Sequence, residues 1–100
     1  MTCYVVGHIE ITDPKRYQDY AAAVMAQVGP LGARVLAAGP ANVVEGPSMP
    51  NQNVIIEFPD EETVLRWYES QEYQAVRPIR LQATATATSQ IAVLRALPSH

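Results

Sequence analysis

Two side chains in separate apolar segments could move a proton. His8 lies in CYVVGHIEIT (residues 3–12), and neutral imidazole can accept or donate a proton near physiological pH. Glu57 lies in NVIIEF (residues 53–58) among apolar neighbours. If the two segments form adjacent strands, directly opposed Cβ atoms lie about 5 Å apart. The sequence therefore predicts a catalytic pair, His8 and Glu57, in which the carboxylate orients the imidazole.

Both residues also have a structural interpretation. A histidine on a strand is commonly a hydrogen-bonded structural group rather than a base. Glu57 could form a salt bridge with one of three arginines, Arg34, Arg77 or Arg80, since a charge among apolar side chains needs a partner. The residues alone leave proton transfer and structural pairing open.

A second group, in WYESQEYQAVRPIR (residues 67–80), could bind a ligand. Trp67 and Tyr73 can stack on a flat apolar molecule, and Arg77 and Arg80 can form paired hydrogen bonds with its carboxylate or phenolate. Arg34 could line the mouth of the same pocket. Packing in the core is the alternative for Trp67 and for its neighbour Tyr68. We predict substrate-binding roles for Arg34, Trp67, Tyr73, Arg77 and Arg80.

Composition excludes several classes of function. Seven basic residues against ten acidic ones give a net charge of -3, without the basic cluster that nucleic acids require. With one cysteine, Cys3, and two histidines, His8 and His100, we expect no disulfide and no metal site. No motif for a flavin, nicotinamide or other cofactor is present. No apolar run reaches the ~18 residues that cross a bilayer, so we expect a cytoplasmic protein that binds no membrane.

The elements that must position these residues follow from periodicity, caps and breakers. We predict a strand over 3–12, and a helix that begins at Asp13-Pro14 and ends at Gly29-Pro30. A second strand (32–38) and a short extended piece (42–45) precede a proline-containing loop and the strand 53–58. Asp60 should cap the next helix, and helical structure over 70–83 should break near Arg77-Pro78. The last strand covers 91–97, and Pro98–His100 is a tail.

The order β, α, β, β, α, β predicts an α+β fold of the ferredoxin-like kind, with one domain over residues 1–100. Its four-stranded antiparallel sheet carries both helices on one face, and an extra short strand is possible. The strand 53–58 is apolar on both faces, so the face without helices must also be buried. The simplest partner is the same face of another copy, which predicts a homodimer.

Short motifs spread over nearly the whole chain carry a family resemblance. They are Asp13-Pro14 with Tyr17 and Tyr20, Glu45-Gly46, Ile56-Glu57-Phe58-Pro59, and Trp67-Tyr68 followed by Ser70, Tyr73 and Arg80. Together they resemble domain-of-unknown-function family 1330, in the dimeric α/β-barrel superfamily. The resemblance implies a ferredoxin-like protomer whose sheet pairs with that of a second copy. The superfamily includes cofactor-free monooxygenases, isomerases, dehydratases, haem-degrading enzymes and proteins without demonstrated activity.

The chain departs from the family pattern at two places. Gly29-Pro30-Leu31-Gly32 stands where a glycine pair is usual, and Gln52-Asn53 stands where an arginine often precedes the third strand. If that arginine binds an anion in relatives, this chain has lost or relocated the contact.

Two functions remain open from the sequence. One is a small enzyme without a cofactor that acts on a hydrophobic, aromatic or polyketide-like molecule by isomerase, cyclase or monooxygenase chemistry. In it His8 or Glu57 moves a proton, and Tyr73, Arg77 or Arg80 stabilises oxyanion charge. The other is a non-catalytic homodimer that binds a small molecule or has a structural role.

Overall fold

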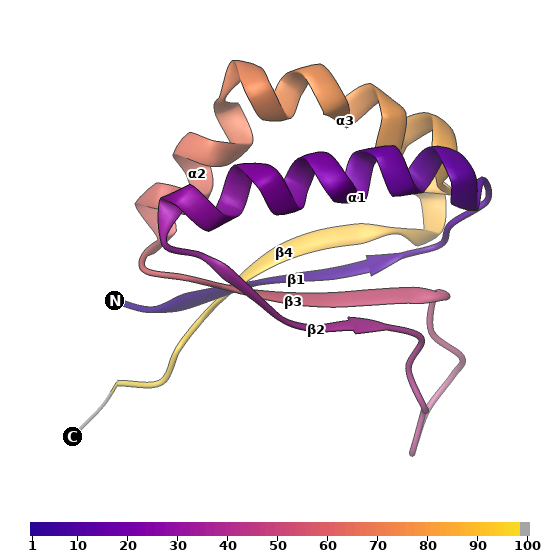
Figure 1. The fold of residues 1–100 in the computed structure, drawn as a ribbon. Helices are drawn as coiled ribbons and strands as arrows, with labels where there is room; N and C mark the ends of the chain where they lie inside the picture. The colour runs from indigo at the N-terminus through magenta and orange to yellow at the C-terminus, as the bar shows by residue number, and fades with distance from the viewer. Residues whose placement is uncertain (99–100) are drawn as a thin grey trace.

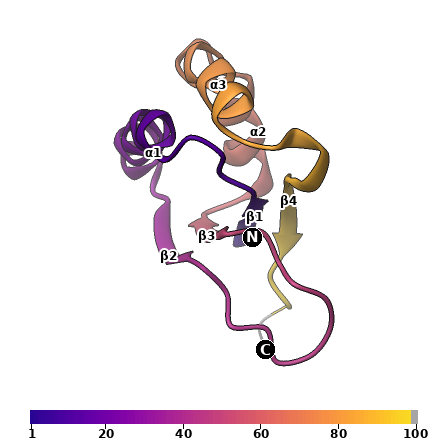
Figure 2. The same cartoon turned by 90° about the vertical axis from the view of Figure 1, so that its right-hand side faces the viewer.

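The computed structural model describes residues 1–98 and shows a sheet covered by helices on one face (Figures 1 and 2). The strands are β1 (Cys3–Ile9), β2 (Arg34–Gly39), β3 (Gln52–Phe58) and β4 (Gln90–Arg95). Their order is β2-β3-β1-β4, and all neighbours are antiparallel. The helices are α1 (Pro14–Val28), α2 (Glu61–Glu69) and α3 (Gln71–Ala83), with short 3₁₀ turns at Gly29–Leu31 and Thr86–Thr88. The predicted four-stranded antiparallel α+β fold, with β1 and β3 central, is confirmed.

Alternation along β1 separates the two faces of the sheet. Cys3, Val5 and Ile9 are buried under the helices, whereas Tyr4 and His8 point to the opposite side and are only partly buried. We call this second side the open face, because none of the helices α1, α2 and α3 covers it (Figure 2). Every side chain on β1 therefore belongs to one of two distinct environments.

Helix caps fix where the covering helices begin. The Asp13 carboxylate accepts a hydrogen bond from the backbone N–H of Arg16 (3.2 Å), and Pro14 occupies the first position of α1. Asp60 caps α2 by accepting from the N–H of Thr63 at 2.7 Å. Both helix starts agree with the sequence prediction.

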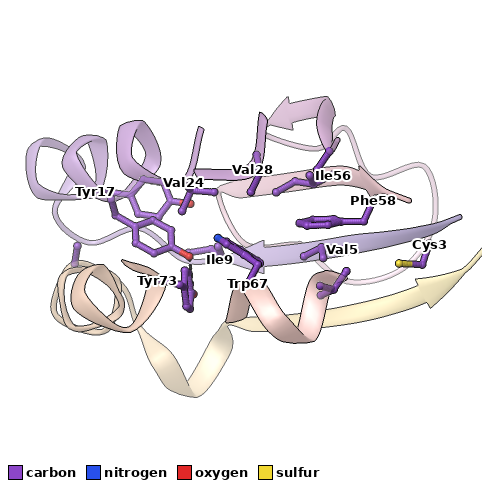
Figure 3. Close-up of a cluster of buried hydrophobic side chains, with 14 residues drawn as sticks. Cys3, Val5, Ile9, Tyr17, Val24, Val28, Ile56, Phe58, Trp67 and Tyr73 are labelled. Atoms are coloured by element: carbon purple, nitrogen blue, oxygen red, sulfur yellow. Dashed lines mark hydrogen bonds between the residues drawn. The ribbon is translucent and has the colours of Figure 1, made fainter. Parts of the chain in front are cut away.

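The core lies between the helices and the sheet (Figure 3). Tyr17 of α1, Trp67 of α2 and Tyr73 of α3 occupy one part of it, and Phe58 and Cys3 lie toward the other end. Phe58, Tyr73 and Cys3 are each at most 1% exposed. The core alternative is therefore confirmed for Trp67 and holds for Tyr73 as well.

Two predicted segments differ in extent. β1 ends at Ile9 rather than at residue 12, and Ile11 makes only an isolated bridge with Thr84. No strand forms over 42–45, since β2 pairs with β3 only as far as Gly39 with Asn53 and the chain then leaves the sheet. The resulting loop extends away from the helices, beyond the open face (Figures 1 and 2).

The predicted break at Arg77-Pro78 is wrong, because α3 runs from Gln71 to Ala83 with Pro78 inside it. Pro78 is exposed, so the carbonyl that it leaves without a helical partner can bond to water. Tyr73, Arg80 and Ala83 are buried on the other side of α3 and anchor it on both sides of the proline. Tyr73 and Arg80 consequently lie two turns apart on one helix face rather than on irregular backbone.

Ser99 and His100 lie outside the described residues, as does most of the expected tail. Among the residues described, no helix is both long and apolar enough to cross a membrane.

Candidate functional site

His8 and Glu57 lie on the same face of the sheet but do not meet. The register of β1 and β3 pairs His8 with Asn53, and Glu57 with Tyr4. Asn53 and Glu57 are four residues apart on β3, or about 13 Å at the usual rise per residue. None of the cavities found among residues 1–98 is lined by both side chains. The prediction that Glu57 orients the His8 imidazole is wrong, because it assumed a different register.

His8 is instead held by an amide. Its Nδ1 lies 2.8 Å from Oδ1 of Asn53, whose Nδ2 donates to the carbonyls of Gly39 and Pro50. Since the amide nitrogen is used as a donor, Oδ1 accepts and His8 Nδ1 carries the proton. His8 lines a wide, open hollow of about 530 Å³ between the loop after β2 and residues 87–90. This environment agrees with the structural interpretation of His8, and its catalytic role stays a prediction.

Glu57 is paired with Arg34 across β2 and β3. Nε of Arg34 donates to Oε1 of Glu57 at 3.1 Å, and the two side chains are 72% and 30% exposed. Both residues lie on the open face, and neither lines a cavity among the described residues. Of the alternatives for Glu57, the structure favours the salt bridge, and it places Arg34 apart from Tyr73 and Arg80.

The other face of the sheet contains an apolar cavity of about 240 Å³ between α1, α3 and the strands. We call it the tyrosine cavity, after Tyr17, Tyr20, Tyr68 and Tyr73 in its wall. Its other lining residues are nearly all apolar: Val5, Gly7, Ile9, Ala21, Val24, Met25, Val35, Ala38, Gln52, Val54, Ile56, Trp67 and Ile91. A concave apolar space with a few hydroxyl groups is typical of a small-molecule site.

Tyr73 is the centre of the aromatic cluster around this cavity. Its ring centroid lies 4.6 Å from that of Trp67, 5.1 Å from Tyr68 and 6.1 Å from Tyr20. Ser70 links the two helices that carry these rings, because its Oγ donates to the Trp67 carbonyl (2.6 Å) and accepts from the Tyr73 N–H (3.1 Å). The break between α2 and α3 therefore sets the relative position of Trp67 and Tyr73.

Two of the tyrosine hydroxyl groups in the wall of the cavity are paired. The hydroxyls of Tyr20 and Tyr73 lie 2.8 Å apart. Burial, with a smaller contribution from Tyr73, raises the pKa of Tyr20 far above its ordinary value, and burial also raises the pKa of Tyr17. These phenols can donate hydrogen bonds to a ligand oxygen, but they are poor bases near neutral pH.

A second hollow, of about 340 Å³, adjoins the tyrosine cavity and contains two arginines. We call it the arginine pocket, after Arg77 and Arg80 of α3. It shares Val5, Trp67, Tyr68 and Ile91 with the tyrosine cavity. Burial opposes the charge on Arg80, but Tyr73 and other tyrosines outweigh this effect and keep the pKa of Arg80 above its ordinary value. Arg80 is a cation at physiological pH.

Trp67, Tyr73, Arg77 and Arg80 thus gather on the helix side, as the sequence suggests, while His8, Glu57 and Arg34 lie on the open face. Sequence reasoning missed the contribution of Tyr17 and Tyr20, which it used only as part of the family resemblance. The signal that could have found them is the polarity of their hydroxyl groups. Two tyrosines three residues apart on a buried helix stripe bring two hydroxyl groups into an apolar interior, where each needs a partner.

The surroundings of Cys3 do not favour a reactive thiolate. Cys3 is 1% exposed, and burial raises the pKa of its thiol, with Glu61 and Asp60 raising it further. No group of three histidine, cysteine, aspartate or glutamate side chains within residues 1–98 is placed to hold a metal ion.

The decisive comparison is with protein families. A model described as domain of unknown function DUF1330 matches residues 2–94. The chain belongs to this family. No functionally curated protein matches the chain in sequence. The resemblance read from the motifs is confirmed, and the departure at Gln52-Asn53 gains a structural meaning, since Asn53 is the residue that holds His8.

Solved structures show the same fold at low identity, as expected for a DUF1330 protein. A protein of unknown function from Rhodopseudomonas palustris aligns with a TM-score of 0.78 and 16% identity, covering 98% of this chain and 84% of that one. A dimeric ferredoxin-like protein of unknown function from Jannaschia sp. CCS1 has a TM-score of 0.78 and 12% identity, over 96% and 100% of the two chains. SnoaB, a cofactor-independent oxygenase from Streptomyces nogalater, has a TM-score of 0.67 and 11% identity, over 98% and 95%.

Proposed function

We propose that this DUF1330 protein is a homodimer that binds a small apolar, aromatic molecule in the tyrosine cavity of each protomer. The observation that carries the proposal is the apolar cavity of about 240 Å³ between the helices and the sheet, walled by aromatic and aliphatic side chains. A well-packed core of this size would normally leave few voids larger than a water molecule. Leaving such a space empty forfeits dispersion contacts, so an apolar occupant would stabilise the fold.

The size of the cavity limits the ligand. An engineered apolar cavity of about 150 Å³ binds benzene. The larger volume here suits a molecule of one or two rings, which would stack against Trp67 and the partly exposed ring of Tyr68. The Tyr20–Tyr73 hydroxyl pair would supply a hydrogen bond to a phenolic or carbonyl oxygen of that molecule.

Catalysis without a cofactor is the second candidate, favoured by the likeness in fold to SnoaB. In this chain the tyrosine hydroxyls would stabilise negative charge on the oxygen of an enolisable or phenolic substrate. Because the pKa values of Tyr17 and Tyr20 are raised, these residues would act as donors, and the substrate would have to ionise readily by itself. A role as base for His8 or Glu57 stays a prediction, and the distance between the two side chains does not support a catalytic pair. Binding without catalysis needs none of these conditions, and it is the function that we propose first.

The homodimer would form through the open face. Ile55 of β3 and Leu94 of β4 are 38% and 62% exposed, although they lie on strands of a four-stranded sheet. The register places Ile55 beside Val6, and Leu94 beside Tyr4, so these side chains form a continuous apolar surface. Pairing this face with its own copy would remove it from water without changing the tyrosine cavity on the opposite side.

The test uses 2-naphthol, a neutral two-ring phenol, titrated into the protein by isothermal titration calorimetry. Ala21 lines the cavity, whereas Ala22 is exposed on α1. We expect Ala21→Phe to fill the cavity and weaken 2-naphthol binding at least tenfold, and the matched Ala22→Phe variant to bind as the wild type does. Equal affinity in all three proteins, or no binding to any, would overturn the proposal.

A further inference from the structure

Within the part of the chain that the structure describes, the charge on Arg80 has no counter-ion. Arg80 is 8% exposed, and its Nε atom is buried without a hydrogen-bond partner, as is Nε of Arg77. The salt bridges among residues 1–98 join Arg34 to Glu57 and Arg95 to Glu61, so no carboxylate there pairs with Arg77 or Arg80. A buried cation without an opposite charge is costly, because burial removes much of its hydration.

The fold compensates this charge only in part. Arg80 lies in the last turn of α3, where the helix dipole favours a cation modestly. The nearby side chains are phenols, of which Tyr73 acts on Arg80 most strongly. Phenols are neutral near pH 7 and can accept a hydrogen bond, but they do not balance a full positive charge. The charge therefore still lacks an anion.

The position of the charge indicates where that anion would come from. Arg77 and Arg80 line the arginine pocket, which shares Trp67 and Tyr68 with the tyrosine cavity. A molecule whose ring occupies the tyrosine cavity could therefore extend a polar group past these shared side chains to the guanidinium groups. Guanidinium forms paired hydrogen bonds with planar oxyanions, of which a carboxylate is the simplest.

We propose that the arginine pocket is an anion subsite, in which Arg80, assisted by Arg77, binds the carboxylate of an aromatic acid whose ring lies in the tyrosine cavity. This inference rests on the proposed function and narrows it to a class of ligand, the small aromatic carboxylic acids. Arg80 supplies the more deeply buried charge, and Arg77, which is partly exposed, lines the same pocket.

The test compares 2-naphthoate with 2-naphthol, which share a ring system and differ in charge near pH 7. Calorimetric titration of the wild type should give tighter binding of 2-naphthoate. Arg80→Met keeps much of the side-chain volume and removes the charge. We expect it to weaken 2-naphthoate binding at least tenfold and to leave the 2-naphthol affinity within twofold. Arg95→Met, which removes an exposed arginine paired with Glu61, is the matched control and should change neither affinity.

Thermal unfolding without ligand separates this role from a structural one. If Arg80 is an unpaired buried cation, Arg80→Met should unfold at the same or a higher temperature than the wild type. A clear loss of thermal stability would show that Arg80 mainly supports Tyr73, and it would count against the subsite. Should Arg80→Met fail to fold, Arg77→Met applies the same calorimetric comparison at a less buried position, with a smaller selective loss expected for 2-naphthoate.

The outcomes distinguish the two proposals. The anion subsite is overturned if Arg80→Met binds 2-naphthoate as tightly as the wild type. It is also overturned if this variant loses affinity for both ligands equally. If 2-naphthol binding still depends on Ala21, the tyrosine cavity remains the site of the ring. If 2-naphthoate depends on Arg80 but neither ligand is affected by Ala21→Phe, the arginines bind the anion while the ring lies elsewhere. That result overturns the proposed function and the ligand placement together.

Discussion

The two faces of this sheet differ in whether their polar groups have partners within the protein. On the open face four polar side chains form two pairs: His8 with Asn53, and Glu57 with Arg34. On the helix side two hydroxyls are paired, but no carboxylate of residues 1–98 pairs with the buried guanidinium of Arg80, and an apolar cavity lies beside it. A completed set of polar contacts suits a structural surface, whereas an incomplete set beside a cavity suits a ligand. We assign dimerisation to the open face and binding to the helix side.

The largest effect should come from placing a charge on the open face. Ile55→Arg would bury a guanidinium in the proposed dimer interface, so we expect a monomer by sedimentation at micromolar concentration where the wild type is a dimer. Leu65→Arg is the control, since Leu65 is an exposed residue of α2, on the helix side. A wild type that sediments as a monomer would remove the assigned role of the open face.

Neighbouring residues on β3 should differ strongly in their effect on stability. Phe58 is 0% exposed and packs against Trp67 with ring centroids 5.6 Å apart, so Phe58→Ala should lower the free energy of unfolding by about 3–5 kcal/mol. Glu57→Gln removes a largely exposed ion pair and should cost less than about 1 kcal/mol. Denaturant unfolding in the Ile55→Arg monomer would measure both without a contribution from dissociation. If both substitutions lowered the free energy of unfolding by similar amounts, the two faces would not differ in their contribution to stability.

Gly7 tests how closely the strands pack under the helices. A Cβ atom at Gly7 would lie 2.9 Å from Cγ1 of Val54, its partner on β3, so Gly7→Ala should destabilise the fold by about 1–3 kcal/mol. Gly29→Ala is the matched control, because no atom lies within 4 Å of the added methyl and the backbone there is right-handed helical. The control should be neutral or gain up to about 1 kcal/mol. A Gly7→Ala protein as stable as the wild type would mean that Val54 rotates freely.

The smallest effect is expected where the sequence placed the catalytic pair. His8→Ala and Glu57→Gln should each leave the calorimetric affinity for 2-naphthol within twofold of the wild type, because neither residue lines the tyrosine cavity. A tenfold loss in either variant would return the binding site to the open face and contradict the assignment of the two faces.

Much of the fold could be predicted from local signals. Asp13-Pro14 and Asp60 mark helix starts, and β-branched runs mark β1 and β3, because these features act within a few residues. Pro78 misled the prediction, since its local cost is outweighed by the burial of Tyr73 and Arg80 on the far side of α3. Tertiary packing of this kind leaves no local signal.

The site was predictable only in part, for a related reason. Trp67, Tyr73, Arg77 and Arg80 lie within 14 residues on consecutive helices, so their grouping follows from local geometry. The pairing of His8 with Glu57 depended on strand register, which a shift of a few residues changes completely. The cavity itself depends on how α1 and α3 lie over the sheet, and no single segment determines that distance.

The most direct test is a crystal structure of the protein soaked with 2-naphthoate. The account predicts density for the naphthalene ring between the helices and the sheet, against Trp67 and Tyr68, with the carboxylate at Arg80. Density beside His8 on the open face, or an empty tyrosine cavity at a saturating ligand concentration, would contradict it.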